Sequence, residues 1–271
     1  MAYVQRLNAY HRILHIFIVV SFLGLVTSGM PLKYDNAPWA AWLMKLLGGY
    51  QSAGLIHRFC AVITFGYFAA HIAYAVYHIA VVKKFRFDMF GPESMVPNIK
   101  DIKDIYYRIK WFLGQGPAPQ LDRWTYWEKF DYWAVFWGVG MIGVSGLMLW
   151  FPEFFGRFLP GWLFNVAIII HSDEALLAAG FIFTIHFFNT HLRPEKFPMD
   201  PVIFTGSIDM EEFKHERPLE YQRLKEAGTL DSSMTSAPSN RIFCLGAAFG
   251  FIAVSVGLIL LVLIVLGQFF Y

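Results

Sequence analysis

The nine histidines are the residues of this sequence that are best suited to bind a cofactor or metal, because most of them lie inside apolar segments. Two segments carry them in similar pairs. His57 and His71 are 14 residues apart, and His171 and His186 are 15 residues apart. Ionisable side chains at membrane depth are costly, so they indicate function by default. His215 lies in a polar loop, and we assign it no role.

The spacings place each pair on approximately one face of a helix. At about 100° per residue, each second histidine returns to within about 40° to 60° of the first, after a rise of roughly 21 to 22 Å. If the two helices run in the same direction, His57 is level with His171 (the outer level) and His71 with His186 (the inner level). Two imidazoles at each level predict two bis-histidine haem sites.

For a single histidine in a helix bundle, the simpler interpretation is a polar residue that is hydrogen-bonded within the bundle. The matched spacing on two helices favours haem ligation instead. His15 is expected at the depth of His71 and His186, so three histidines compete for two inner axial positions. Three further histidines lie deeper and could hold propionates, line a quinone pocket, shuttle protons or ligate a third haem: His11, His78 and His191.

The composition makes the membrane the expected solvent. Of 271 residues, 56% are hydrophobic and 15% charged, and the mean hydropathy is +0.45. A net charge of +2 gives no reason to expect a nucleic-acid partner. The two cysteines, Cys60 and Cys244, lie in apolar runs, and no Cys-x-x-Cys-His motif occurs, so any haem must be bound non-covalently.

Five segments are long and apolar enough to cross a membrane, namely 10–30, 54–82, 130–150, 164–190 and 242–267. They predict an all-α fold, an integral membrane helical bundle with a four-helix haem-binding core. We expect that core over 1–195 with a cytoplasmic loop at 83–129, a cytoplasmic connection over 196–241 with helix from Met210 to Ala227, and a fifth spanning helix over 242–271.

The distribution of Lys and Arg predicts the orientation. Residues 83–129 hold nine of the 22 basic residues and 192–241 hold seven. Cytoplasmic loops carry an excess of Lys and Arg, so we expect both connections and the N-terminus inside. Four basic residues near the proposed haem levels could pair with propionates or anchor the interface: Arg12, Arg58, Lys129 and Arg193.

The stretch from Arg6 to Leu32, the His57-Arg58 pair and the stretch from His186 to Glu195 carry a family resemblance. They resemble bacterial cytochrome b subunits of the formate dehydrogenase gamma and thiosulfate reductase type. The histidine spacings also resemble those of the haem-binding four-helix bundle of quinol:cytochrome c oxidoreductases. Both resemblances imply a diheme cytochrome b in a bacterial inner membrane, embedded in lipid.

The two resemblances imply different inner ligands. The formate dehydrogenase type implies His15 opposite His186. The quinol oxidoreductase pattern implies His71 opposite His186, which the helix geometry also favours and which we predict. Together they imply a cytochrome c or iron-sulfur redox subunit near His57 and His171. They also imply a quinone site at the inner end, with contacts from Arg12, His78, Lys129, His191, Arg193 and Glu195.

The leading hypothesis is electron transfer between membrane quinone and a partner subunit, with no catalytic residue assigned to this chain. A histidine-lined metal transporter is the second hypothesis, since imidazole suits Zn, Cu and Ni. It predicts acidic or thiol co-ligands, which the segments around His71 and His186 lack. The third is a membrane anchor for a soluble oxidoreductase, and an anchor needs no matched histidines.

Overall fold

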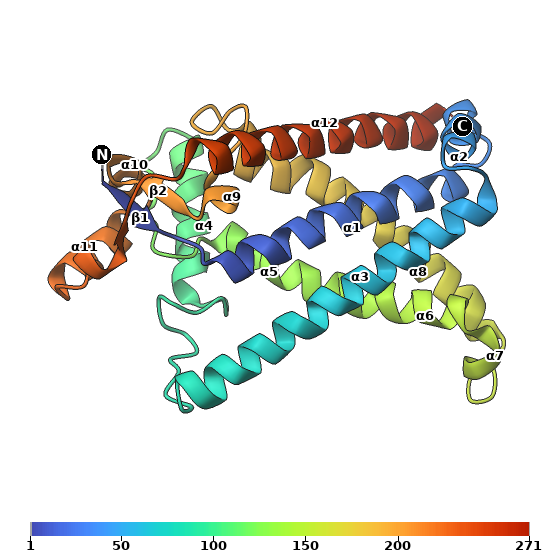
Figure 1. Ribbon diagram of the computed structural model, residues 1–271, viewed down its shortest axis with the longest axis horizontal. Coiled ribbons are helices and arrows are strands. Elements are labelled where there is room, and N and C mark those ends of the chain that lie inside the picture. Colours follow the sequence, from blue (N-terminus) through green and yellow to red (C-terminus); the bar gives the residue numbers. More distant parts are fainter. Residues whose placement is uncertain (1, 271) are drawn as a thin grey trace. The chain divides into compact units, whose positions relative to one another are not determined.

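The computed structural model of the protein describes residues 2–270 and consists mainly of helices (Figure 1). Within that range, five helical runs are long and apolar enough to cross a membrane: Ala9–Lys33, Tyr50–Val82, Tyr126–Trp150, Trp162–Leu192 and Asn240–Phe270. Each predicted span lies inside one of these runs. The prediction of a multi-pass helical membrane protein is therefore confirmed.

Three of the five runs contain π-helical segments, which the sequence did not predict. They are η1 (His78–Val82), η2 (Val139–Gly143), η3 (Ile182–His186) and η4 (Phe188–Leu192). Short π-helical turns inside α-helices are often found at functional sites. Three of these segments contain a histidine, and η2 contacts one.

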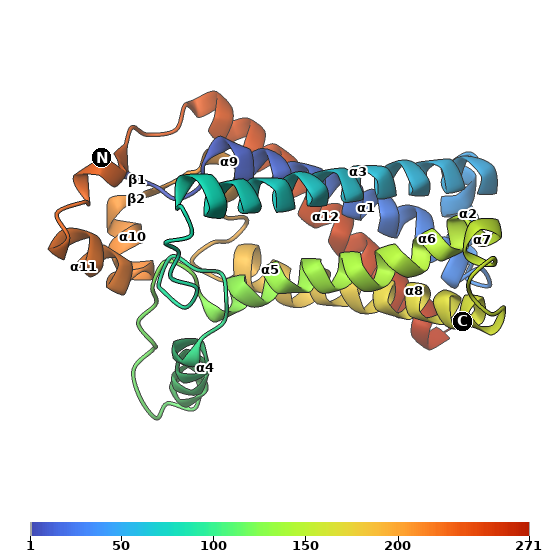
Figure 2. The ribbon, with the colours of Figure 1, turned by 90° about the horizontal axis from the view of Figure 1, so that it is seen from below.

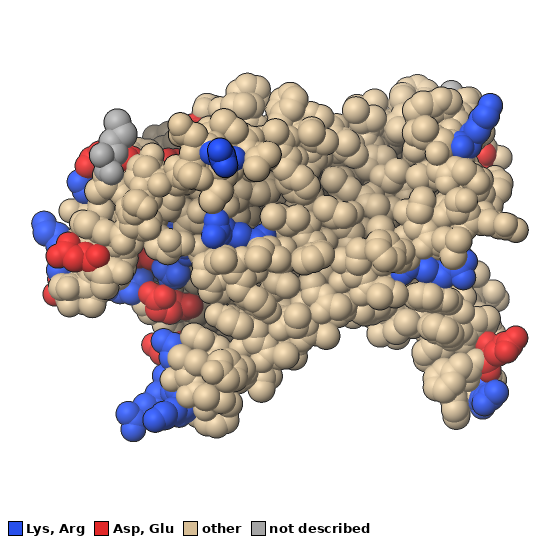
Figure 3. Space-filling view, in the orientation of Figure 1, with Lys and Arg blue, Asp and Glu red and all other residues tan. Residues whose placement is uncertain are grey.

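The chain divides into two compact units. The helix unit comprises Ile13–Tyr74, Val135–Asp200 and Ala247–Tyr271, and it contains most of the length of the apolar helices. The connection unit comprises Met1–Arg12, Ala75–Ala134 and Pro201–Gly246. Lys, Arg, Asp and Glu gather over the connection unit, whereas the long helices present an almost uncharged surface (Figure 3).

In the helix unit, long helices alternate in direction. They are α1 (Ala9–Lys33), α3 (Tyr50–Tyr77), the run Tyr126–Trp150 that ends in the seven-residue α6 (Val144–Trp150), α8 (Trp162–Phe181) and α12 (Asn240–Phe270). The short helices α2 (Pro38–Leu46) and α7 (Pro152–Phe155) lie between them in sequence. The helices α3 and α8 run in the same direction (Figures 1 and 2). This is the arrangement that the histidine levels require.

The apolar core of the helix unit lies between α1, α8, η3 and α12. Val26 and Met30 of α1 and Phe183 of η3 are buried there with Leu260 and Ile264 of α12. Glycines in α12 allow close contact, since a Cβ at Gly257 would lie 2.6 Å from the Phe187 ring. Close approach at small residues is how helices pack where water supplies no driving force.

The connection unit contains a small antiparallel sheet of strand order β2-β1-β3. The strands are β1 (Tyr3–Gln5), β2 (Ser207–Asp209) and β3 (Met234–Thr235). Its helices are α4 (Ile99–Phe112), the first part of α5 (Tyr126–Gly138), α9 (Val202–Thr205), α10 (Met210–Glu216) and α11 (Pro218–Glu226), with a 3₁₀ turn η5 (Asp231–Ser233). The helix expected from Met210 to Ala227 forms as two, separated at Arg217 because Pro218 begins α11.

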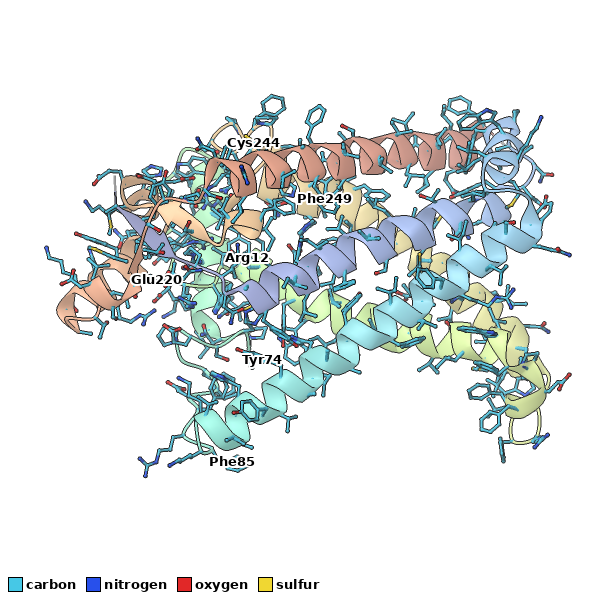
Figure 4. All side chains as sticks on the ribbon, in the orientation of Figure 1. Arg12, Tyr74, Phe85, Glu220, Cys244 and Phe249 are labelled. Atoms are coloured by element: carbon cyan, nitrogen blue, oxygen red, sulfur yellow. The ribbon has the colours of Figure 1, made fainter. Side chains whose placement is uncertain are left out.

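Buried ion pairs join distant parts of the connection unit. Glu220 of α11 is 1% exposed and pairs with Arg6 and with Arg123, whose Nη1 lies 2.9 Å from Glu220 Oε1 (Figure 4). Arg217 pairs with Glu128 at 3.0 Å. These pairs link the N-terminal strand to both predicted cytoplasmic connections. The sequence did not predict the strand.

Candidate functional site: paired histidines between the apolar helices

The outer level brings His57 of α3 and His171 of α8 together. Their ring centroids are 6.0 Å apart, with an interplanar angle of 68°. A bond from a metal to an imidazole nitrogen is about 2.0 to 2.1 Å long, so one metal holds two opposed nitrogens about 4 Å apart and the ring centres further. The spacing fits two imidazoles on opposite sides of one iron.

His171 is fixed in the tautomer that suits a ligand. Its Nδ1 lies 3.0 Å from the carbonyl oxygen of Ile142, in η2. A carbonyl oxygen can only accept, so Nδ1 carries the proton and a neutral ring leaves Nε2 with a free lone pair. Metal-bound histidines are usually oriented in this way. Gly146 lies against the ring, because a Cβ there would be 2.9 Å from His171 Cε1.

His57 is held in the same manner by a serine. Its Nδ1 lies 3.0 Å from Ser28 Oγ, and Ser28 Oγ lies 2.6 Å from the Gly24 carbonyl oxygen. The single hydroxyl proton goes to that carbonyl, so Ser28 accepts the proton of His57 Nδ1. The Nε2 atom of His57 is then also free to ligate. Gly29 makes room for the ring, with a Cβ position 3.2 Å from His57 Cε1.

A row of small residues along α1 sets the position of α3. Ser21 Oγ accepts a hydrogen bond of 3.2 Å from Thr64 Oγ1. A Cβ at Gly24 would lie only 2.4 Å from Cys60 Sγ. Together with Ser28 they contact α3 along three successive turns. This contact fixes both the depth and the rotation of His57.

The inner level groups three histidines of the helix unit. His15 lies near His186 and His191. The rings of His186 and His191 are 6.3 Å apart and nearly perpendicular, at 89°. Among residues 2–270, His15 Nδ1 is a buried nitrogen without a hydrogen-bond partner. A buried polar atom of this kind calls for an explanation such as a bound ligand.

His191 is arranged differently from the outer histidines. Its Nδ1 accepts a hydrogen bond of 3.3 Å from the backbone N–H of Asp200. A neutral ring therefore carries its proton on Nε2, which makes that atom a donor and not a metal ligand. His191 thus suits hydrogen bonding to a polar ligand better than it suits a third haem.

His71, the inner ligand that the sequence predicts, lies in α3 beside aromatic rings. Its ring centroid is 6.1 Å from that of Phe136, which is 5.1 Å from that of Phe68.

The predicted basic residues have protein partners. Arg12 (Figure 4) donates from Nη1 to the carbonyl oxygens of Phe204 and Thr205, at 2.9 and 3.0 Å, within the connection unit. Arg58 is exposed, donates from Nε to the Gly54 carbonyl at 3.0 Å and lies over the Trp150 ring. Lys129 pairs with Asp101 at 2.9 Å.

Other predicted contacts lie close to the ends of helical runs. Arg193 follows η4 directly and is half-buried, and Glu195 is exposed two residues later. His78 begins η1 in the connection unit. His11 lies in the first turn of α1.

Sequence reasoning missed the groups that orient the outer histidines. Ser28 gave a weak signal as a hydroxyl within a run of small residues, Thr-Ser-Gly, near the end of α1. The Ile142 carbonyl gave no signal in the sequence, because its oxygen is free to accept from His171 only where η2 interrupts the α-helix. Within residues 2–270, no group of three or more His, Cys, Asp or Glu side chains is placed to hold a metal ion. A haem iron needs only two protein ligands in a bis-histidine site.

Fold and site together define a multi-pass helical membrane protein with paired histidines between its helices. No family model matches the chain. It is similar to the "Formate dehydrogenase, cytochrome b556(fdo) subunit" of Escherichia coli strains K12, O6:H1 and O157:H7. Each is 24% identical over 176 residues, which cover 64% of this chain and 72% of the relative. The likeness supports a membrane cytochrome b of this type.

Proposed function

We propose that this chain is the electron-transfer subunit of a respiratory redox complex, with two b-type haems stacked between its helices. The observation that carries the proposal is the outer pair. His57 and His171 face each other at 6.0 Å, and each donates its Nδ1 proton to a fixed oxygen. The cytochrome b name of the relatives supports the same cofactor.

We assign the inner haem to His186 and His15. His15 lies near His186, and its buried Nδ1 has no hydrogen-bond partner, so a ring nitrogen of His15 is available to bind iron. His71, the choice from helix geometry, is the alternative. Bis-histidine iron has no open coordination position, so the haems supply one-electron exchange. Substrate chemistry then belongs to another subunit.

The inner end suits a quinone head group. His191 presents an Nε2 donor there, and Arg193 and Glu195 follow within four residues. We place a cytochrome c or iron-sulfur subunit at the outer level. The relatives are formate dehydrogenase subunits by name, and we infer a similar place in a larger complex of a bacterial inner membrane.

The direct test of function uses the purified full-length chain under anaerobic conditions. Adding a quinol should produce the absorption bands of reduced b haem, and a quinone-site inhibitor should slow this reduction. A His191→Gln variant should slow quinol reduction while chemical reduction by dithionite stays complete. A colourless, folded protein that binds Zn or Cu instead would favour the transporter hypothesis.

A further inference from the structure

The helix α4 presents a continuous apolar face that the described residues of the connection unit leave exposed. Ile99, Ile102, Ile109, Phe112 and Leu113 are between 54% and 72% exposed. At about 100° per residue these positions fall on one side of the helix. Exposed apolar side chains are ordinary on a membrane-spanning helix, but α4 lies outside all five apolar runs.

The opposite side of α4 is charged and faces the protein. Asp101 and Asp104 are each 7% exposed. Lys129 Nζ lies 2.9 Å from Asp101 Oδ2, and Lys100 pairs with Asp104. A capping box between Asn98 and Asp101 fixes the first turn of α4. The Asp101–Lys129 pair therefore fixes which side of α4 faces the protein, and the apolar side is left outward.

The attachment of α4 sets its depth relative to the membrane. Lys129 is the fourth residue of α5, where the apolar run Tyr126–Trp150 begins. The Asp101–Lys129 pair thus ties α4 to the end of a membrane-spanning helix. The preceding apolar run ends at Val82, and the loop after it exposes Phe85 and Phe90 (Figure 4). Both flanking segments hold α4 at the level where spanning helices leave the lipid.

We propose that α4 lies in the membrane interface, with its apolar face in the acyl-chain boundary and its edge against lipid phosphates. Lys103 and Lys110 lie along one edge of the apolar face, where long basic side chains can reach phosphate groups. Tyr106, on the same face, adds an aromatic side chain of the kind that is enriched at this depth. The basic edge, together with the attachment of α4 to the end of a membrane-spanning helix, favours lipid with anionic phosphate groups as the partner of this face.

Spin labels on the full-length protein in nanodiscs that contain phosphatidylglycerol test the proposal. A Cys244→Ser background removes the exposed native thiol and keeps the buried Cys60. Labels are attached at Ile102→Cys and Ile109→Cys on the apolar face. Gln115→Cys, in the exposed turn after α4, is the aqueous control, and Phe251→Cys, which is 59% exposed on α12, is the lipid control.

Collisions with oxygen and with a polar nickel chelate are measured by power saturation. The labels at 102 and 109 should be accessible to oxygen and shielded from nickel, with a ratio between those of the two controls. Labels as accessible to nickel as the label at 115 would show α4 in water and overturn the proposal. Labels shielded from both reagents would show a protein partner on this face and overturn it equally.

Discussion

A neutral imidazole carries one proton, so the partner of Nδ1 decides whether Nε2 can bind a metal. In His171 the partner is a backbone carbonyl, and in His57 it is a serine hydroxyl that already donates elsewhere. In His191 the partner is a backbone N–H, which gives the opposite tautomer. Single hydrogen bonds thus assign His57 and His171 to metal binding and His191 to hydrogen-bond donation.

Replacing Ser28 by Ala should weaken the outer haem. The variant removes the hydroxyl that accepts the His57 Nδ1 proton, and loss of such a supporting group typically lowers metal affinity about 10- to 100-fold. The measurement is the rate of haem transfer to excess apomyoglobin, which should rise for one haem of the two. Ser21→Ala is the matched control, since Ser21 is equally buried on α1 but contacts Thr64. Equal haem loss from both variants would argue against an orienting role for Ser28.

Alanine variants of His15 and His71 decide the inner ligand. We expect His15→Ala to lose one haem and His71→Ala to keep both, because His15 is the histidine grouped with His186. Haem content and the low-spin spectrum of each purified variant provide the comparison. Loss of one haem from His71→Ala, with both haems kept in His15→Ala, would instead support His71 as the inner ligand, as the helix geometry predicts.

At the scale of elements, the positions of the outer ligands depend on close contacts between helices. The helix spacing follows from small residues on α1, and the carbonyl that orients His171 lies in η2. Both features occur where two helices are in contact. A π-helical segment interrupts the regular hydrogen-bond pattern of the α-helix and so changes which carbonyl oxygen faces a neighbouring helix.

Gly24→Ala should force α1 and α3 apart. The new Cβ would lie 2.4 Å from Cys60 Sγ, and overpacking of this kind costs about 1 to 3 kcal/mol. The thermal unfolding temperature should fall, and the outer haem should be lost first, since His57 is one turn from Cys60. Gly66→Ala on α3 is the control, because its Cβ would meet nothing within 4 Å. Similar destabilisation by both changes would contradict the role of the close contact.

The sequence predicted the five apolar helices because length and hydropathy alone determine them. It also placed His57 and His171 at one level, since both helices run in the same direction and the helical period determines which face and which depth each histidine occupies. Its choice of His71 over His15 as the inner ligand stays a prediction, because it rests on matched spacing along one pair of helices and takes no account of where a third helix lies. The tautomer of His171 was beyond prediction, as it depends on η2, and strand β1 was missed because its partners are about 200 residues away.

At the scale of the whole molecule, charge and hydropathy divide the chain between two environments. The helix unit has few charged groups, and the connection unit holds the buried ion pairs around Glu220. Because most Lys and Arg residues lie in two connections, we infer that these face the cytoplasm.

A reporter enzyme that is active only outside the cytoplasm tests this orientation. Fused at Gln115, in the exposed turn after α4, it should stay inactive, and fused after Phe270 it should be active. Activity at Gln115 with none at the C-terminal fusion would reverse the orientation and exchange the sides of the quinone and the partner subunit.

The central claim is that this chain holds two b haems between its helices. The most direct measurement is the haem content of the purified full-length protein, from the pyridine haemochrome spectrum and the protein concentration. We expect two non-covalent b haems per chain in the wild type, and one in His57→Ala and in His171→Ala. A folded wild-type protein that contains no haem, or the same haem content in both variants as in the wild type, would contradict it.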